Sequence, residues 1–428
     1  MAILEDMTDL ARRAKAASRR VARLTEVDRN RVLVAMADAL LEATVELEAA
    51  NALDREVGRA MGLSAAMLDR LTLDRARITA MAQGVRDVAA LPDPVTRVLD
   101  ERVRPNGLRL RKIAVPIGVV VIIYESRPNV TADAASLCLK TGNATLLRGG
   151  KEALHSNRLI ASIMVSAARA VMADFPEDAI LVVPTADREA IPALLSLTQY
   201  VDLCMPRGGE GLIRAVTACS KVPVIKHYKG VCHVYVQADA DLRMAEEIVF
   251  NAKCQRPSTC NAAETLLVDR TIADRFLPQI ASRLATKEVL FHADIEAIPL
   301  LRSGLGDRVS QVQEASAEDW STEYNDYVIN VRIVKGLEEA IQHITDYGSG
   351  HSDAIITADE TVAERFLSEV DSAAVYWNAS TRFTDGGEFG MGAEIGISTD
   401  KIGARGPMGL EELCTYKWQG FGTGQIRS

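Results

Sequence analysis

Residues 119–151 read VVVIIYESRPNVTADAASLCLKTGNATLLRGGK, and this stretch decides the fold class of the chain. An unbroken apolar run at 119–123 is followed by a polar turn and then by an alanine-rich stretch, 132–140, that suits a helix. A second apolar run, Thr145–Leu147, leads into a Gly-Gly turn. Continuous apolar strands separated by helices are typical of a parallel sheet covered on both faces. The stretch therefore predicts an α/β fold.

The alternation of strand-like and helical segments continues along the chain. Ser156–Met172 is rich in alanine and fits a second helix, and glycine or proline marks the joints between elements. Such joints carry the ligand loops of α/β proteins. We expect further strands at Ile180–Val183, Val222–Ile225, Val234–Val236 and Leu266–Val268.

Residues 1–90 differ from this pattern and predict helices. Thr25 followed by Asp28 resembles a capping box at the start of one helix. Apolar residues then return at the spacing of a single buried helix face. These residues are Leu33, Met36, Ala37, Leu40 and Leu41.

The composition is that of a globular protein. The length of 428 residues suggests two or three domains, and 48% of the residues are hydrophobic and 25% are charged. A formal charge of −9 disfavours binding to nucleic acid or to an anionic membrane. The most apolar run, Val115–Tyr124, is about half the length needed to cross a bilayer. Acidic residues near the N-terminus argue against a targeting peptide, so we expect a soluble, cytoplasmic protein.

Seven cysteines are scattered along the chain without the paired spacing of a zinc site or a disulfide framework. The five histidines other than His227 likewise show no metal-ligand spacing. The sequence therefore predicts no metal site, and free thiols suit a reducing compartment.

Cys260 is the cysteine with the most informative surroundings. It lies in NAKCQRPSTCN (251–261), between a helical segment and an expected strand. A thiolate on a turn can be presented to a substrate while its backbone stays fixed, and it is a strong nucleophile near neutral pH. Two alternatives stay open: Cys260 is a small buried hydrophobe, or it forms a regulatory disulfide with Cys254, which the reducing compartment disfavours.

A polar turn, YESRPNVT (124–131), follows the first apolar strand. It places Asn129 at the carboxyl end of that strand, which is the usual functional edge of an open α/β sheet. The side-chain amide has the chemistry to donate to a developing oxyanion. Asparagine also favours turns for conformational reasons, so this role is one of two interpretations.

Two basic glycine turns each precede a helical segment. Arg148, Gly149 and Lys151 belong to the first, and Gly208 and Gly209 belong to the second. Backbone N–H groups and positive charge at a helix N-terminus suit a phosphate or the phosphorylated ribose of NADPH. Neither turn is a G-x-G-x-x-G fingerprint, but two of them on one domain favour a dinucleotide.

Three features of the second half of the chain have more than one interpretation. His227, in KHYKG (226–230), is a lone histidine of the kind that is usually structural. Glycine is dense between 386 and 409, where the backbone either passes close to a ligand or subunit or forms a surface loop without a role. The tail CTYKW (414–418) is β-prone and suits pairing with another strand, including one from a partner.

Four long segments together resemble the aldehyde dehydrogenase superfamily, and the similarity extends over nearly the whole chain. The resemblance implies a Rossmann-like NADPH-binding domain at 1–230 and an α/β catalytic domain at 231–385. It also implies a β-ribbon that joins subunits, built from 386–428 with part of 100–125. The four segments are YESRPNVTADAASLCLKTGNATLLRGGKEA, NAKCQRPSTCNAAETLLV, YGSGHSDAII and YWNASTRFTDGGEFGMGAEIGIST.

The resemblance also implies roles for individual residues. Cys260 occupies the nucleophile position, and Asn129 matches the asparagine that completes the oxyanion hole with the Cys260 N–H. Other positions match those that contact the nucleotide. These are Arg148, Gly149 and Lys151 for the ribose and phosphate, Gly208 and Gly209 for the pyrophosphate, and Glu323 for the nicotinamide ribose.

The activity implied is NADPH-dependent reduction of L-glutamyl 5-phosphate to L-glutamate 5-semialdehyde through a Cys260 thioester, the second step of proline biosynthesis from glutamate. His227 departs from the superfamily pattern, because aldehyde oxidisers have at that place a glutamate that activates the hydrolytic water. A thioester resolved by hydride needs no such base. Cys254 is a second departure, at a position where relatives have threonine.

The substrate carries a phosphate and a carboxylate, whereas the protein is net negative, so local cations are expected to bind it. Arg127, Arg256 and Arg382 are the candidates, because planar guanidinium groups suit bidentate binding of oxyanions. Arg382 is the first candidate for the carboxylate, and a structural salt bridge is its alternative role.

Other functions stay open. Within the superfamily the chain can oxidise an aldehyde with NAD. Outside it, the chain can be a thiol acyltransferase or hydrolase without a nucleotide, or a scaffold without activity. The family and the β-prone tail predict a homo-oligomer, either a dimer or a tetramer. Contact with glutamate 5-kinase, the upstream enzyme, would shelter a labile acyl phosphate but has no support in the sequence itself.

Overall fold

A computed structural model describes residues 2–427, which fold into two compact units. The first unit takes the chain up to Lys226, the segment Gly390–Gly396 and the chain from Met408 onward. The second unit takes His227–Phe389 and Ile397–Pro407. The short strands β14 (Gly396–Ser398) and β15 (Gly406–Met408) pair where the chain passes from one unit to the other.

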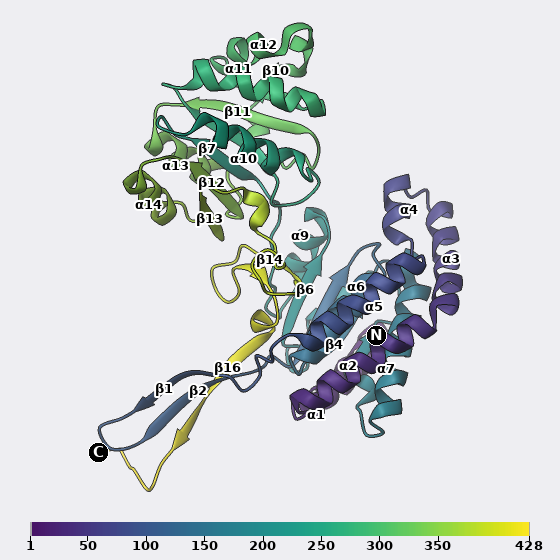
Figure 1. Ribbon diagram of the computed structural model, residues 1–428. Helices are drawn as coiled ribbons and strands as arrows, with labels where there is room; N and C mark the ends of the chain where they lie inside the picture. Colours follow the sequence, from purple (N-terminus) through teal and green to yellow (C-terminus); the bar gives the residue numbers. More distant parts are fainter. Residues whose placement is uncertain (1, 428) are drawn as a thin grey trace. The chain divides into compact units, whose positions relative to one another are not determined.

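A four-stranded parallel sheet with the order β5-β4-β3-β6 lies at the centre of the first unit (Figure 1). The apolar run at 119–123 forms most of β3, and every residue of this strand is buried. The chain adds β4 and β5 on one side of β3 and returns to the other side for β6, so the strand order reverses between β3 and β6. Ligands of open α/β sheets bind outside the carboxyl ends of the strands at such a reversal. The strands are β3 (Val119–Tyr124), β4 (Ala144–Arg148), β5 (Ile180–Val182) and β6 (Leu203–Arg207), and the connecting helices are α6 (Asn129–Lys140), α7 (Leu154–Val171), α8 (Ala190–Leu195) and α9 (Glu210–Cys219).

Five helices precede this sheet, as the sequence predicts. Thr25 caps α2, since its hydroxyl accepts from the Asp28 N–H (3.1 Å) and donates to the Asp28 carboxylate (2.7 Å). The predicted apolar face of α2 is buried, except that Leu41 is only half-buried. The helices are α1 (Ala2–Val21), α2 (Glu26–Glu42), α3 (Thr44–Ala60), α4 (Ala65–Leu71) and α5 (Arg75–Ala90).

The first unit also carries an antiparallel ribbon of three strands with the order β1-β2-β16 (Figure 1). The β-prone tail forms β16 (Cys414–Phe421), which pairs with β2 (Arg109–Pro116) of the same chain, and β1 (Val98–Val103) pairs with the other side of β2. As the edge strand, β16 exposes Tyr416 and Trp418. An edge strand with exposed aromatic residues is a template for pairing with another chain.

A seven-stranded parallel sheet with the order β10-β9-β11-β8-β7-β12-β13 forms the second unit. Helices cover both faces, because alternate residues of the same strands enter different cores: Leu266 packs with α10, α11 and α12, whereas Leu267 packs with α13 and α14. The strands are β7 (Cys232–Val236), β8 (Ala263–Asp269), β9 (Leu290–Ala293), β10 (Val312–Glu314), β11 (Val328–Val334), β12 (Ser352–Ile356) and β13 (Ala374–Trp377). The helices are α10 (Leu242–Cys254), α11 (Ala273–Leu284), α12 (Ala297–Leu305), α13 (Leu337–Tyr347) and α14 (Glu360–Glu369).

One predicted strand is wrong. Val222–Ile225 contributes only an isolated bridge, between Val224 and Cys204, instead of a regular strand. Pro223 explains the difference, since proline has no N–H to give to a strand ladder. As for membranes, none of the helices within residues 2–427 has the length and apolar character that a bilayer span requires.

Candidate active site

Cys260 lies on a short loop between α10 and β8, and its side chain is half-buried. An ion pair joins the two elements that flank this loop: Lys253 Nζ, at the end of α10, lies 2.8 Å from Glu264 Oε2, at the start of β8. Both side chains are fully buried. Burial raises the pKa of Glu264 to about 7, although Lys253 acts in the opposite direction. The pair fixes the ends of the loop that carries the thiol.

Lys253→Met is therefore expected to destabilise the second unit by about 3–5 kcal/mol, because removal of one partner leaves the Glu264 carboxylate buried without a counter-charge. Urea unfolding followed by tryptophan fluorescence measures this, since Trp320 and Trp377 both lie in the second unit. The double variant Lys253→Met/Glu264→Leu should recover most of the loss. A single variant as stable as the wild type would contradict the assigned role of the pair.

The backbone of Cys260 packs directly against Gly230. A Cβ atom at Gly230 would lie 1.8 Å from the Cys260 carbonyl oxygen and 2.6 Å from the Cys260 Cα. The same carbonyl accepts a hydrogen bond from the Cys232 thiol (3.2 Å). Only glycine permits this approach, so the segment that leads into β7 sets the position of the nucleophile backbone.

Gly230→Ala is expected to lower kcat by about 100-fold, because displacing a reacting group by about an ångström has an effect of that size. Steady-state rates and the alkylation rate of Cys260 would measure the displacement. Gly211→Ala is the matched control, since a Cβ there meets nothing within 4 Å. If Gly230→Ala behaved like Gly211→Ala, the close approach would have no functional consequence.

Arg382 holds the nucleophile loop from the other side. Its Nε donates to Gln255 Oε1 (2.7 Å) and its Nη1 donates to Thr259 Oγ1 (3.0 Å) and to the Asn261 side-chain oxygen. Burial lowers the pKa of Arg382, although its charge also interacts electrostatically with Cys260. A guanidinium beside a thiol favours the thiolate. Arg256, on the same loop, is exposed to solvent.

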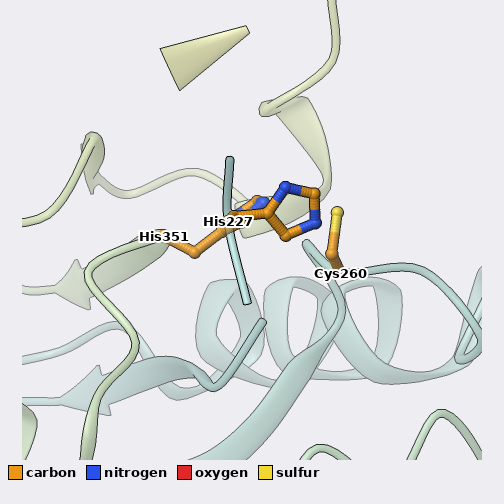
Figure 2. Close-up of side chains that lie close together, drawn as sticks. All are labelled: His227, Cys260 and His351. Atoms are coloured by element: carbon orange, nitrogen blue, oxygen red, sulfur yellow. The ribbon is translucent and has the colours of Figure 1, made fainter. Parts of the chain in front are cut away.

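Two histidines lie beside Cys260 (Figure 2). One ring nitrogen of His227, one of His351 and the Cys260 sulfur all lie within 4.8 Å of one another. His227, Cys260 and His351 lie in the segments that lead into β7, β8 and β12. These strands are neighbours in the parallel sheet, so their amino ends meet at one edge. The sequence prediction missed His351. YGSGHSDAII was quoted only as a family segment, although a histidine just before an apolar strand was the available signal.

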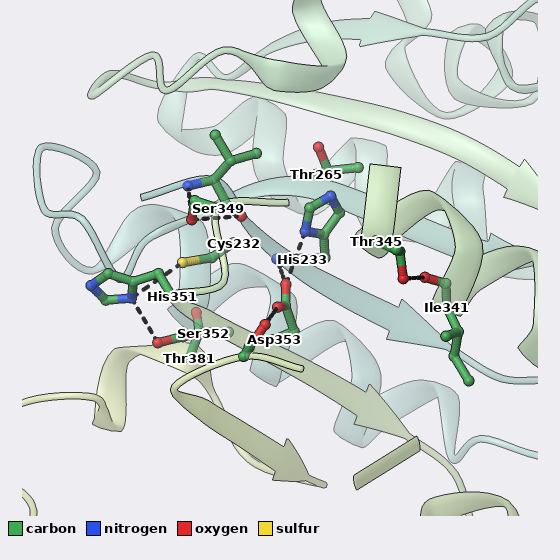
Figure 3. Close-up of polar contacts among 12 residues, drawn as sticks. Cys232, His233, Thr265, Ile341, Thr345, Ser349, His351, Ser352, Asp353 and Thr381 are labelled. Carbon is green, nitrogen blue, oxygen red and sulfur yellow. Dashed lines mark hydrogen bonds and ion pairs between the residues drawn. The ribbon is translucent and has the colours of Figure 1, made fainter. Parts of the chain in front are cut away.

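His351 is fully buried and belongs to a polar network (Figure 3). Its Nδ1 is hydrogen-bonded to Ser352 Oγ (2.8 Å) and lies 3.8 Å from the Cys232 sulfur. The network continues from Ser352 to the hydroxyl of Thr384 (2.6 Å). Burial lowers the pKa of His351 to about 3, and His227 adds to the effect. The ring of His351 is therefore neutral at physiological pH.

Asn129 lies in the first unit, at the start of α6. Its Nδ2 donates to Asp133 Oδ2 (2.9 Å), one helical turn later. Burial raises the pKa of Asp133 to about 6. An amide group has two N–H donors, so this bond fixes the orientation of the amide while one N–H stays available for a ligand. Its predicted oxyanion role stays a prediction.

The second basic glycine turn lies at the strand-order reversal of the first unit. Gly209 caps α9, and its N–H donates to the carboxylate of Glu125 (3.2 Å), which follows β3. A Cβ at Gly208 would lie 2.7 Å from the Glu125 carboxyl carbon. Glu125 is exposed. The Glu125 carboxylate thus occupies the turn at which the cofactor pyrophosphate is predicted to bind. A phosphate bound at the N-terminus of α9 would have to displace this carboxylate.

The first basic glycine turn follows β4. The Arg148 guanidinium donates hydrogen bonds to the carbonyl oxygens of Gly149 (2.9 Å) and Ala186 (2.9 Å). Some of its N–H groups therefore stabilise the turn itself. Burial lowers the pKa of Arg148. Lys151, in contrast, is exposed and is the cation of this turn that faces solvent. Arg127 is also exposed, after β3.

The predicted site residues thus divide between the two units. Cys260, Arg256 and Arg382 come together around one loop of the second unit. Glu323, also in the second unit, is half-buried on the loop before β11 and interacts electrostatically with Glu264. The other predicted site residues lie in the first unit: Asn129, Arg127, Arg148, Gly149, Lys151, Gly208 and Gly209.

Comparisons with known proteins agree with the fold. Residues 2–326 match the aldehyde dehydrogenase family. The chain is 52% identical over 423 residues to gamma-glutamyl phosphate reductase of Opitutus terrae, covering 99% of this chain and 98% of the relative. The crystal structure of gamma-glutamyl phosphate reductase from Thermotoga maritima superposes with a TM-score of 0.95 at 42% identity, covering 99% of this chain and 100% of that one. An engineered glycolyl-CoA reductase with bound NADP+ shares the fold, with a TM-score of 0.65 at 14% identity and 96% coverage of each chain. The chain belongs to the aldehyde dehydrogenase family and, within it, to the gamma-glutamyl phosphate reductases.

Proposed function

We propose that this chain reduces L-glutamyl 5-phosphate to L-glutamate 5-semialdehyde and phosphate, with Cys260 as nucleophile and NADPH as reductant. The observation that carries the proposal is the Cys260 loop: a half-buried thiol whose backbone is fixed by Gly230 and whose loop is held by Arg382. Full-length similarity to gamma-glutamyl phosphate reductases supplies the substrate. The reaction is the second step of proline biosynthesis.

The first half of the reaction needs a thiolate and an anion site. The Cys260 thiolate, favoured by the nearby charge of Arg382, attacks the acyl carbonyl carbon. Phosphate leaves with the electron pair of its bond to that carbon, and a thioester remains on Cys260. We assign Asn129 and the Cys260 N–H to the negative oxygen of the tetrahedral intermediate, because such donors stabilise charge that develops in the transition state.

The second half needs protection of the thioester from water. NADPH, when bound, would supply the hydride that converts the Cys260 thioester into the aldehyde and the free thiolate. His227 donates through Nδ1 to the Ile397 carbonyl (2.8 Å), at the place where aldehyde oxidisers have a water-activating glutamate. The carboxylate base of the aldehyde oxidisers is therefore missing at this place, and a thioester resolved by hydride needs no base to activate water. The arrangement therefore fits reduction better than hydrolytic oxidation.

The first unit fits a dinucleotide by its topology. The strand order reverses between β3 and β6, and the basic glycine turns follow β4 and β6. Lys151 is the exposed cation for a 2′-phosphate, and Gly208 and Gly209 line the turn for the pyrophosphate once Glu125 moves aside. We also propose that the β16 edge of the ribbon joins subunits. Its exposed aromatic residues lie on an edge strand that pairs with β2 on one side and with no other strand of the described residues on the other side.

The reverse reaction tests the proposed function. With L-glutamate 5-semialdehyde and NADP+, the wild type should form NADPH only when inorganic phosphate is present, because phosphate is the nucleophile that releases the acyl group from Cys260. Formation of NADPH without phosphate would mean that water resolves the thioester and that the chain is an aldehyde oxidiser. Substituting NAD+ in the same assay measures the cofactor preference.

Arg382→Ala is expected to raise KM for the acyl phosphate by about 10–100-fold, the effect of losing a hydrogen bond to a charged group. It should also lower kcat, since the guanidinium holds the nucleophile loop. Arg256→Ala is the companion variant: its side chain is exposed, so it tests anion binding without disturbing the loop. An unchanged KM in Arg382→Ala would remove it as the carboxylate anchor.

A further inference from the structure

We propose that His227, Cys260 and His351 form a binding site for a thiophilic divalent cation such as Zn2+, and that the bound cation reversibly blocks the nucleophile. Two imidazoles and one thiolate are a ligand set that zinc prefers, and three protein ligands leave a fourth position open to water. The ligand atoms lie within 4.8 Å of one another. Zinc–ligand bonds of about 2.0–2.3 Å would bring the three atoms closer together than this limit.

The strongest indication of a ligand is the orphan nitrogen of His351. This side chain is completely buried, and its Nε2 has no hydrogen-bond partner among the described residues. A buried polar atom without a partner lowers the stability of the fold and needs an explanation, such as an ion. A cation coordinated by Nε2 would supply the missing interaction.

The other ring nitrogens are arranged as those of metal ligands usually are. His227 Nδ1 donates to the Ile397 carbonyl (2.8 Å), and His351 Nδ1 is hydrogen-bonded to the Ser352 hydroxyl (2.8 Å). Ligating histidines almost always engage their second nitrogen in this way, which fixes the ring and its tautomer. Because a carbonyl oxygen can only accept, the His227 contact places a proton on Nδ1.

Cation binding is incompatible with the reaction proposed above. Coordination requires the Cys260 thiolate, so the thiol proton is released to solvent when the cation binds. The same sulfur electron pair is then committed to the metal and is not available to attack the acyl carbon. The cation is therefore an inhibitor and not a cofactor, and this blocking effect rests on the proposed function, whereas the binding itself does not.

Cobalt titration of the metal-free full chain tests the site without any substrate. Co2+ should bind at one equivalent and give an absorption band from sulfur-to-cobalt charge transfer, and Zn2+ should displace it. The band should vanish in Cys260→Ala and stay in Cys219→Ala, a thiol of the first unit. His351→Ala should bind at least about 100-fold more weakly, since even losing a partner of a ligand weakens binding 10–100-fold. His155→Ala, an exposed histidine, should bind as the wild type does.

The outcomes separate the claims. A band that persists in Cys260→Ala would overturn the site, and so would an unchanged affinity in both His351→Ala and His227→Ala. If His351→Ala does not fold, the cobalt affinity of His227→Ala decides. Zinc binding without loss of phosphate-dependent activity would overturn the blocking effect. A metal-free wild type that lacks reductase activity would count against the proposed function, while the cobalt titration would still decide the site.

Discussion

Cys260→Ser is expected to lower phosphate-dependent NADP+ reduction by at least about 10⁴-fold, since removal of a covalent nucleophile has an effect of this order or larger. A serine hydroxyl does not ionise near neutral pH, so the variant lacks the anionic nucleophile that a cysteine thiolate supplies. The matched measurement is the mass of the protein after mixing with an acyl substrate. The wild type should gain an acyl group at Cys260, and the variant should gain none.

Cys254→Ser is the control for this experiment. Cys254 lies six residues earlier, is buried at the end of α10, and its pKa is raised to about 11 by burial. It is therefore an inert thiol close to the reactive one, and its substitution should leave turnover within about threefold, the ordinary scatter of a mild core change. Loss of activity in Cys254→Ser, or acylation that persists in Cys260→Ser, would place the nucleophile elsewhere.

Most of the fold could be predicted because it follows from local patterns. The strand at 119–123 is apolar at every position, since both faces of a central parallel strand are buried, and it forms β3 as expected. The cap at Thr25 is equally local and is confirmed. Val222–Ile225 has the same apolar character, but Pro223 prevents regular pairing. The apolar character of a run therefore does not by itself decide whether the run forms a strand.

The site was harder to predict, because its contacts join segments that are far apart in sequence. His351 meets Cys260 only through the order of β8, β7 and β12, which no local pattern encodes. Gly230 was quoted in KHYKG without a role, and its need for glycine depends on the Cys260 backbone. Sequence reasoning also looked to the carboxyl ends of strands, whereas the nucleophile loop lies at the amino end of β8. The sequence thus indicated that Cys260 lies on a turn, but it did not indicate which residues surround the thiol.

Asn129→Ala is expected to lower kcat by about 10²–10³-fold, which corresponds to about 3–4 kcal/mol for one oxyanion donor. One amide N–H already donates to Asp133 (2.9 Å), so the group is pre-oriented and the donor needs no reorganisation during the reaction. KM for the acyl phosphate should change little, because the charge on the carbonyl oxygen develops only in the transition state. Steady-state kinetics of the forward reaction measure both constants.

Asn129→Asp and Asn251→Ala sharpen this test. Asn129→Asp keeps the size of the side chain but replaces the donor with a carboxylate, which repels an oxyanion, so kcat should fall at least as far as in Asn129→Ala. Asn251 is exposed on α10, and its substitution should leave kcat unchanged. If Asn129→Ala changed only KM, the amide would bind the ground state of the substrate and would not stabilise the transition state. The oxyanion would then depend on the Cys260 N–H and on charge from Arg382, and Arg382→Ala would show the larger loss in kcat.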